Sequence, residues 1–510
     1  MLVRWSCREV RPLEIADVVS APVGSKAGSA LRSAAYVFGS RIALQLISLA
    51  KGILVARLLG PSDLGAFFLV TAVVGALEIA SHPGLEDALI DSPDERPSLW
   101  QATWTLLLVR GAVVSGLLAV LAGPICSWLN ASEVAPMLRV VALVPLMRGF
   151  TSLSLAWTRR RVDLRPSVKT ELVANIVETG LGLALVAATG SPWALVAAML
   201  CGTAARTLWS FRYAGFSPRF SFAWADVRPL FAFSKWRLVS NVLYYVSVRA
   251  DDLLVGRYLG RGALGNYRIA YRLANLPTTE IVSVLEQVAF PALAQRAKEA
   301  PANAITAYHR YLLLTCGLAG PLAAVVAALA QPIVATLLGS AYAAAATPLA
   351  IMCVAGYLRA VVSTAGSLVL GLGRPSLDTL MSSARAVVLV VAIITLAPHG
   401  VVGAAIASLL SLVVTVPLWL MALALVDAHP AAAVSVALRR LPVAFIAGAG
   451  AWSVSLAPWG PLVTLLVGGL LGLVGAAIGT ALFDRPLGRE LSAMARRMRS
   501  GLAARGSVAP

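Results

Sequence analysis

The sequence predicts an all-α integral membrane protein with about 14 transmembrane helices, arranged as two parallel six-helix repeats followed by two further helices. Three observations support this prediction: the composition, the spacing of the apolar stretches and an internal duplication. The chain of 510 residues is 59% hydrophobic and only 13% charged, and its mean hydropathy is +0.81. A water-soluble fold of this composition would lack the polar residues needed to cover its surface.

Apolar stretches long enough to cross a bilayer, which takes about 20 residues, recur along the whole chain. The first six lie at residues 31–56, 62–82, 101–123, 134–157, 168–189 and 192–213. The next six lie at residues 236–257, 263–291, 308–330, 343–370, 376–396 and 400–425. The last two lie at residues 441–457 and 460–483.

The chain also repeats itself over a long interval. ILVARLLGPSDLG at residues 53–65 recurs as LLVGRYLGRGALG at residues 253–265, and LAGPICSWLN from Leu121 resembles LAQPIVATLLG from Leu329. A period this long excludes a short solenoid repeat and indicates a duplicated bundle. The repeated glycines are expected to mark equivalent tight turns outside the membrane: Gly60, Gly65, Gly260 and Gly265.

The spans define the expected domains. The first 28 residues contain no continuous apolar stretch, so we interpret them as a disordered tail, or in part as the product of a misassigned start codon, and not as a signal peptide. In chain order we expect a cytoplasmic tail (1–30), an N-terminal six-helix bundle (31–213), a cytoplasmic linker (214–235), a C-terminal six-helix bundle (236–425), two extra transmembrane helices (441–483) and a basic cytoplasmic tail (484–510).

The basic residues predict the orientation of these spans. With a cytoplasmic N-terminus, the inside segments collect most loop arginines, whereas the outside loops hold only Arg57, Arg257 and Arg261. This asymmetry places both termini in the cytoplasm. Each bundle has an even number of spans, so the pseudo-two-fold axis runs along the membrane normal. Inside loops facing anionic lipid account for the net charge of +18, and no nucleic-acid partner is expected.

Charged residues inside the spans are functional candidates, because an unpaired charge in lipid costs several kcal/mol. The deepest arginines are interpreted as facing a water-filled lumen between the bundles. A net cationic lumen favours an anionic substrate, since the planar guanidinium binds phosphate or pyrophosphate in a bidentate way. The candidate substrate-binding residues, which include polar neighbours on the same helix faces, are Arg41, Arg148, Arg359, Arg272, Asn241 and Gln45.

Acidic residues are fewer within the spans. Asp251, Asp252 and Glu178 are candidates for binding a coupling proton or sodium ion. Arg139 and Arg206 are interpreted as snorkelling to an interface. A structural alternative is an ion-pair lattice between neighbouring helices, formed by Arg249, Asp251, Asp252, Arg268 and Arg272.

Neither a metal site nor a catalytic domain is expected. The five cysteines lack CxxC spacing and histidine partners, which favours a role as small buried hydrophobic residues. The outside loops are short, such as APHG near residue 398 and APWG near residue 458. We therefore expect no enzyme activity and no cofactor.

Three segments carry a family resemblance: ILVARLLGPSDLGAFFLVTAVV at the first hairpin, GLEDALIDSPDE after the second helix, and FAFSKWRLVSNVLYYVSVRADDLLVGRYLGRGALGNYRIAYRLANLP at residues 231–277. They are similar to the polysaccharide biosynthesis, or Wzx-type oligosaccharide flippase, family. Its superfamily also contains multidrug exporters and the lipid II flippase. Many relatives have one aspartate before the LLxGR run, where this chain has Asp251 and Asp252.

The resemblance implies a V-shaped pair of bundles around a cationic lumen in the bacterial inner membrane. It implies alternating-access transport of undecaprenyl-pyrophosphate-linked oligosaccharide for exopolysaccharide or lipopolysaccharide biosynthesis. The implied partners are this lipid-linked oligosaccharide, membrane lipid, a coupling proton or sodium ion, and a polymerase and chain-length regulator of the same pathway.

Other functions remain open at this point. A cation-coupled multidrug exporter of the same superfamily is the main alternative, although a pump for cationic drugs would favour an acidic cavity. A membrane glycan polymerase or ligase is a second alternative, but such enzymes usually need a large external loop. A structural scaffold would leave the duplication and the deep arginines unexplained.

Overall fold

The computed structural model describes residues 45, 47–92, 96–161, 163–213, 215–222, 241, 245 and 249–483, and every regular element among them is a helix. Eight helices or helical stretches in these ranges are long and apolar enough to cross a membrane, and a bent pair makes a possible ninth. A helix satisfies its own backbone hydrogen bonds in lipid, which explains why apolar runs fold this way. The all-helical fold class is confirmed, while the number of 14 spans stays a prediction.

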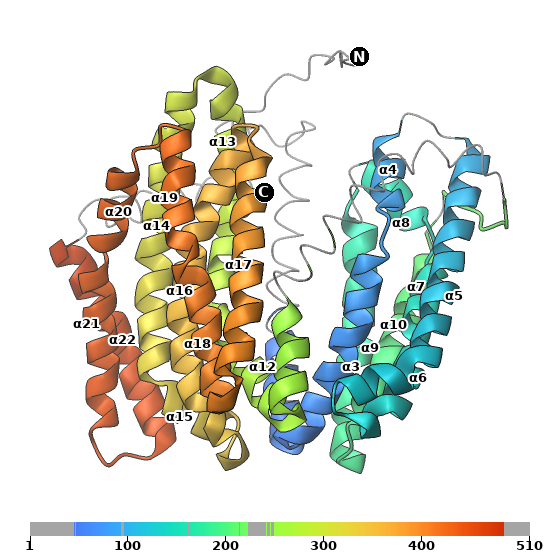
Figure 1. Ribbon diagram of the computed structural model, residues 1–510, viewed down its shortest axis with the longest axis horizontal. Coiled ribbons are helices and arrows are strands. Elements are labelled where there is room, and N and C mark those ends of the chain that lie inside the picture. The colour runs from blue at the N-terminus through green and yellow to red at the C-terminus, as the bar shows by residue number, and fades with distance from the viewer. Residues whose placement is uncertain are drawn as a thin grey trace, which may run out of the picture.

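The helices form two groups that meet at one end and diverge at the other (Figure 1). Helical residues 47–58 belong to the first group. They precede α3 (Pro61–Ala80), α4 (Leu85–Asp91), α5 (Pro97–Trp128), η1 (Ser132–Val134), α6 (Ala135–Val141), α7 (Leu143–Gly149), α8 (Ser154–Arg160), α9 (Arg165–Thr189) and α10 (Trp193–Ser210).

The second group begins with helical residues 249–259. It continues with α12 (Arg261–Asn275), the π-helical turn η2 (Leu276–Glu280), α13 (Ile281–Glu299), α14 (Pro301–Ala328), α15 (Ala330–Leu337), η3 (Ser340–Ala345), α16 (Ala346–Gly371), α17 (Pro375–Leu396), η4 (Ala397–His399), α18 (Gly400–Val413), α19 (Thr415–Leu425), α20 (Pro430–Leu438), α21 (Leu441–Ser455) and α22 (Pro461–Phe483).

One expected span is not a single straight helix. Residues 134–157 are divided among α6, α7 and α8, and the chain bends by 52° between Ser132–Gly149 and Ser154–Arg160. The tails at 1–30 and 484–510, most of the linker at 214–235, and Arg41 lie outside the described residues.

The two groups touch where α3 crosses α12. A Cβ on Gly65 would lie 1.7 Å from the carbonyl oxygen of Arg261, and a Cβ on Gly265 would lie 2.0 Å from that of Pro61. Only glycine allows two helix backbones to approach this closely. The expectation that Gly65 and Gly265 mark turns was therefore wrong: both lie inside helices, at the crossing of the two repeats.

The two repeated segments also contact one another reciprocally. Arg57 donates from Nε to the carbonyl of Leu337 at 2.8 Å, at the end of α15. Its counterpart Arg257 lies over the ring of Trp128, 5.7 Å from the centroid, at the end of α5. Asn130 also donates to the carbonyl of Arg257 at 3.5 Å. Each arginine thus contacts a helix end on the opposite group, Arg57 at α15 and Arg257 at α5. These two helix ends are the similar segments that begin at Leu329 and Leu121.

Candidate functional site

A polar cavity of about 610 Å³ lies among the helices of the first group. It is bounded by α3, α4, α5, α7, α8, α9 and α10. Its charged and titratable lining consists of Glu78, His82, Glu86, Arg110, Arg148, Arg159, Glu171 and Arg206. Four arginines and three glutamates leave this lining with one excess positive charge.

Close helix packing positions Arg148 on the cavity wall. A Cβ on Gly149 would lie 3.0 Å from the carbonyl of Leu107, and one on Gly111 would lie 2.6 Å from that of Pro145. The glycines therefore let α5 and α7 pack backbone against backbone, with Arg148 in the last turn of α7.

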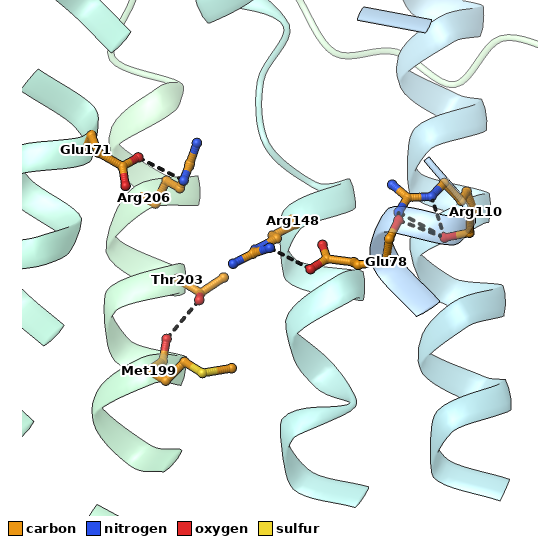
Figure 2. Close-up of polar contacts among 8 residues, drawn as sticks. Glu78, Arg110, Arg148, Glu171, Met199, Thr203 and Arg206 are labelled. Atoms are coloured by element: carbon orange, nitrogen blue, oxygen red, sulfur yellow. Dashed lines mark hydrogen bonds and ion pairs between the residues drawn. The ribbon is translucent and has the colours of Figure 1, made fainter. Parts of the chain in front are cut away.

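Two neighbouring arginines converge on the end of α3, as Figure 2 shows. Arg148 forms an ion pair of 2.5 Å with Glu78. Arg110, from α5, donates to the backbone carbonyl of Glu78 at 2.7 Å and to the hydroxyl of Ser81 at 3.0 Å. Arg110 thus uses neutral acceptors to hold the end of α3, while Arg148 uses the carboxylate.

Two further ion pairs line the cavity. Arg206 pairs with Glu171 at 2.8 Å between α10 and α9 (Figure 2), and Arg159 pairs with Glu86 at 2.7 Å. The Arg148 side chain is 49% exposed, and those of Arg206 and Glu171 are 42% and 41% exposed. Glu78, the partner of Arg148, is only 13% exposed. The Arg206–Glu171 pair is exposed on both sides and contributes only about 0–1 kcal/mol, so an arriving anion can displace Glu171 at little cost.

A smaller cavity of about 300 Å³ shares this wall and adds Asn241. The Asn241 amide donates to the carbonyl of His82 at 2.9 Å, which joins the second repeat to the end of α3. Nδ1 of His82 accepts the amide hydrogen of Gly84 at 3.2 Å. Burial, reinforced by Arg110, lowers the pKa of His82 below its usual 6.5, so the ring is uncharged at neutral pH.

The structure brings together only part of the expected substrate-binding set. Arg148 and Asn241 line the smaller cavity together. Arg272, on α12, donates to the backbone carbonyl and hydroxyl of Ser48 in the first repeat. Arg359, on α16, contacts α12 instead. Gln45 is half-buried in the helical segment leading to residue 58.

The three residues expected to bind a coupling ion each have a different main partner. Glu178 forms an ion pair with Lys51. Asp252 is buried and pairs with Arg268 at 3.2 Å and, more weakly, with Arg249 at 3.6 Å. Part of the ion-pair lattice that was expected as a structural alternative is therefore present around Asp252. Arg272 does not join these ion pairs.

Tyr267 donates to the neighbouring carboxylate of Asp251 at 2.8 Å, and both side chains are buried. Asp252 keeps one buried carboxylate oxygen without a hydrogen-bond donor among the described residues. A buried oxygen of this kind is a place where a proton or a small cation can bind.

Sequence reasoning missed several cavity residues. Glu78, Arg110 and Glu171 stand out as charges within apolar spans, but their partners are separated by tens of residues along the chain. Arg206 was expected to snorkel, whereas it pairs with Glu171 at the cavity wall. A signal for these residues was available: acidic and basic residues on helices expected to be adjacent could have been matched as ion pairs.

Comparison with known proteins gives concordant relationships. Residues 54–347 match the sequence profile of the family described as polysaccharide biosynthesis protein. The chain is 26% identical over 292 residues to the succinoglycan biosynthesis transport protein ExoT of Rhizobium meliloti (strain 1021), covering 57% of this chain and 58% of that protein. It is 23% identical over 334 residues to the lipopolysaccharide biosynthesis protein WzxC of Escherichia coli (strain K12), covering 64% of this chain and 67% of that protein.

Solved structures share the fold. The lipid II flippase MurJ, in an inward closed conformation, matches with a TM-score of 0.70 at 13% identity, covering 87% of this chain and 98% of that chain. An inward-facing multidrug resistance transporter of the MATE family matches with a TM-score of 0.56 at 15% identity, covering 76% and 96%. The apolar helices and these relationships identify a multi-pass membrane protein. The chain belongs to the polysaccharide biosynthesis protein family, as its resemblance to that family predicted.

Proposed function

We propose that this protein translocates a polyprenyl-pyrophosphate-linked oligosaccharide across the bacterial inner membrane by alternating access. The observation that carries the proposal is a cavity lined by four arginines, with one excess positive charge, in a chain of the polysaccharide biosynthesis family. The diphosphate would replace the glutamates as the partner of the arginines, since a guanidinium binds phosphate oxygens in a bidentate way.

The proposed cycle uses the two helix groups as opposing bodies. Their contact at α3 and α12 closes one end in the described conformation, and separation there would open the other side of the membrane (Figure 1). We further propose 14 spans, with the domain boundaries expected from the sequence and with both termini in the cytoplasm. The oligosaccharide would cross between the groups while the polyprenyl chain stays in the bilayer.

We assign the residues as follows. Arg148 and Asn241 face the headgroup in the first group, and a proton or sodium ion binds near Asp251, Asp252 or Glu178. Synthesis of the polymer by a downstream polymerase and chain-length regulator is an alternative driving process. The remaining proposed substrate contacts are Arg41, Gln45, Arg272 and Arg359.

A multidrug exporter is the second candidate, because the MATE transporter shares the fold. Charge argues against it: the larger cavity has an excess of arginine, which repels cationic drugs. A glycan polymerase or ligase is disfavoured by the short connections between the described helices, such as the one between α21 and α22.

The decisive experiment is deletion of the gene in its own host, followed by return of variants. Deletion should stop surface polysaccharide and accumulate lipid-linked oligosaccharide, and the wild-type gene should restore export. Arg41→Ala, Arg148→Ala and Arg359→Ala should abolish export while the protein remains in the membrane. Arg139→Ala, at an exposed arginine of α6, is the matched control. Normal polysaccharide in the deletion strain, together with new drug sensitivity, would refute the proposal in favour of the exporter.

A further inference from the structure

The segment that follows α10 returns to pack against α5. The backbone amide of Ser221 donates to the hydroxyl of Thr105 at 3.0 Å. The ring of Phe220 lies 5.5 Å from that of Trp104, measured between centroids. Figure 1 shows residues 215–222 on the side of α5 that faces away from the second group, at the end where the two groups diverge. This part of the chain is therefore attached to the first group.

The loop covers one end of a lipid-facing stripe on α5. Thr105 is followed at intervals of three or four residues, the spacing of one helix face, by Val109, Val113, Leu117 and Val120. These four side chains are 45–77% exposed, whereas that of Thr105 is 2% exposed. Exposed apolar residues of a membrane-spanning helix face lipid. Residues 215–222 thus lie where this lipid-facing surface ends.

The outer surface of the loop continues the apolar stripe. The side chains of Phe220 and Phe222 are 68% and 81% exposed. Single exposed apolar side chains are ordinary, but two phenylalanines separated by one residue, beside a lipid-facing stripe, form a patch. Such rings are more stable in the interfacial region of a bilayer than in water.

Exposed arginines accompany the patch. Arg219 directly precedes Phe220 and is exposed. Arg212 is also exposed and lies over the ring of Trp209, 5.4 Å from its centroid. A ring face attracts a guanidinium and leaves its charge in place. Neither arginine has an ion-pair partner among the residues that the structure describes, so the apolar rings have positive charge beside them.

A third cation lies at the start of the loop. A Cβ on Gly215 would lie 2.5 Å from Cδ1 of Trp157. Arg161 is exposed and lies over that tryptophan ring, 4.9 Å from its centroid. The acid nearest to it in the sequence, Asp163, accepts a hydrogen bond from the backbone amide of Arg165 at 3.1 Å. Aromatic rings with basic side chains are the combination that an anionic membrane surface favours.

We propose that residues 215–222 form an interfacial anchor, in which Phe220 and Phe222 enter the boundary of the acyl chains while Arg212 and Arg219 bind the headgroups of anionic phospholipid. Because the loop is attached to α5, this lipid contact holds the first group at a fixed depth in the bilayer. The anchor does not rest on the proposed function, since it depends only on the protein lying in a membrane.

Full-length protein in lipid nanodiscs tests the anchor. A fluorophore is attached at Ser217→Cys, an exposed position in the loop. The background carries Cys7→Ser and Cys201→Ser, because Cys201 is exposed and the other described cysteines are buried. The nanodiscs contain phosphatidylcholine alone or mixed with phosphatidylglycerol. Contact with lipid is measured by quenching from phospholipid brominated in the upper part of its acyl chains.

The apolar part of the anchor is tested by its phenylalanines. The fluorophore should be quenched in the parent protein, and Phe220→Ser/Phe222→Ser should shift the loop toward water by about 10-fold or more, because each ring favours lipid over water. Phe220→Leu/Phe222→Leu should keep most of the quenching. Phe445→Ser, at a 76% exposed phenylalanine of α21, is the matched control and should leave it unchanged.

The charged part is tested by lipid composition. Phosphatidylglycerol should increase the quenching, and each arginine is expected to contribute about fivefold to this preference. Arg212→Gln/Arg219→Gln should abolish the preference, high salt should reduce it, and Arg139→Gln should retain it.

Three results would overturn the proposal. A fluorophore that stays in water in both kinds of nanodisc, or quenching that persists in the serine variant, would reject the anchor. Quenching that ignores phosphatidylglycerol, salt and both arginines would reject anionic lipid as the partner. A fluorophore shielded from a water-soluble quencher in detergent as fully as in nanodiscs would show that the chain itself covers the loop. An unfolding temperature of the serine variant equal to that of its parent would exclude unfolding as the cause of the expected change.

Discussion

Substitution of Gly265 tests whether the crossing of α3 and α12 holds the two helix groups together. In Gly265→Ala the new Cβ would lie 2.0 Å from the carbonyl oxygen of Pro61. Comfortable contact needs about 3.5 Å, so α12 must move away from α3 by about 1.5 Å. The obstacle is backbone, which cannot rotate aside as a side chain can. Overpacking of this kind costs about 1–3 kcal/mol.

A disulfide cross-link measures the separation directly. A Cβ on Gly262 lies 3.1 Å from the hydroxyl oxygen of Ser62, within reach of a disulfide in the variant Ser62→Cys/Gly262→Cys. The background carries Cys201→Ser, since Cys201 is exposed. The pair should cross-link readily with glycine at position 265 and several-fold more slowly after Gly265→Ala, together with a lower unfolding temperature.

Gly116→Ala in α5 is the matched control, because a Cβ there has no other atom within 4 Å. This change should leave the cross-linking rate unaltered and raise stability by about 0.5–1 kcal/mol, as expected for an exposed helical glycine. If Gly265→Ala cross-links and melts like its parent, the crossing does not depend on close backbone contact and the reasoning fails.

Three further predictions follow from other contacts. Arg57→Ala combined with Arg257→Ala should slow the same cross-link more than either change alone, because each arginine contacts a helix end of the opposite group; an unchanged rate would count against this role. Arg206→Ala should lower the free energy of unfolding by less than about 1 kcal/mol, because its pair with Glu171 is about 40% exposed; a loss of several kcal/mol in chemical denaturation would contradict that. The pKa of His82 is lower in the folded protein than its usual 6.5, so the unfolded chain takes up the proton first and stability falls as pH drops below 6.5. His82→Gln should flatten the dependence of unfolding temperature on pH in that range.

The membrane-spanning stretches and the recurring segments could be found from the sequence because both are visible as patterns along the chain. Apolar runs of span length, repeated glycines and the clustering of basic residues do not require knowledge of which helices touch. They predicted an all-helical membrane protein. The resemblance carried by segments such as residues 231–277 predicted the family, and the profile match over residues 54–347 confirms it. The bend between α7 and α8 was missed, although Gly149, Thr151 and Ser152 interrupt the apolar run at that point.

The candidate site was predictable only in part. Arg148 and Asn241 were selected as charged or polar residues in apolar spans, and they meet beside His82. Glu78 and Arg206 were not selected, because their importance comes from partners on other helices.

The sequence by itself determined the membrane environment and the helical class, since composition and periodicity express the cost of placing polar backbone and side chains in lipid. The tertiary structure decided what the repeated residues do. Gly65 and Gly265 serve a helix crossing, Arg57 reaches a helix end 280 positions away, and Arg148 on α7 meets Glu78 on α3. These contacts depend on which helix faces meet. Coulomb energies and backbone clearances change over distances of a few ångströms, and the sequence pattern does not contain those distances.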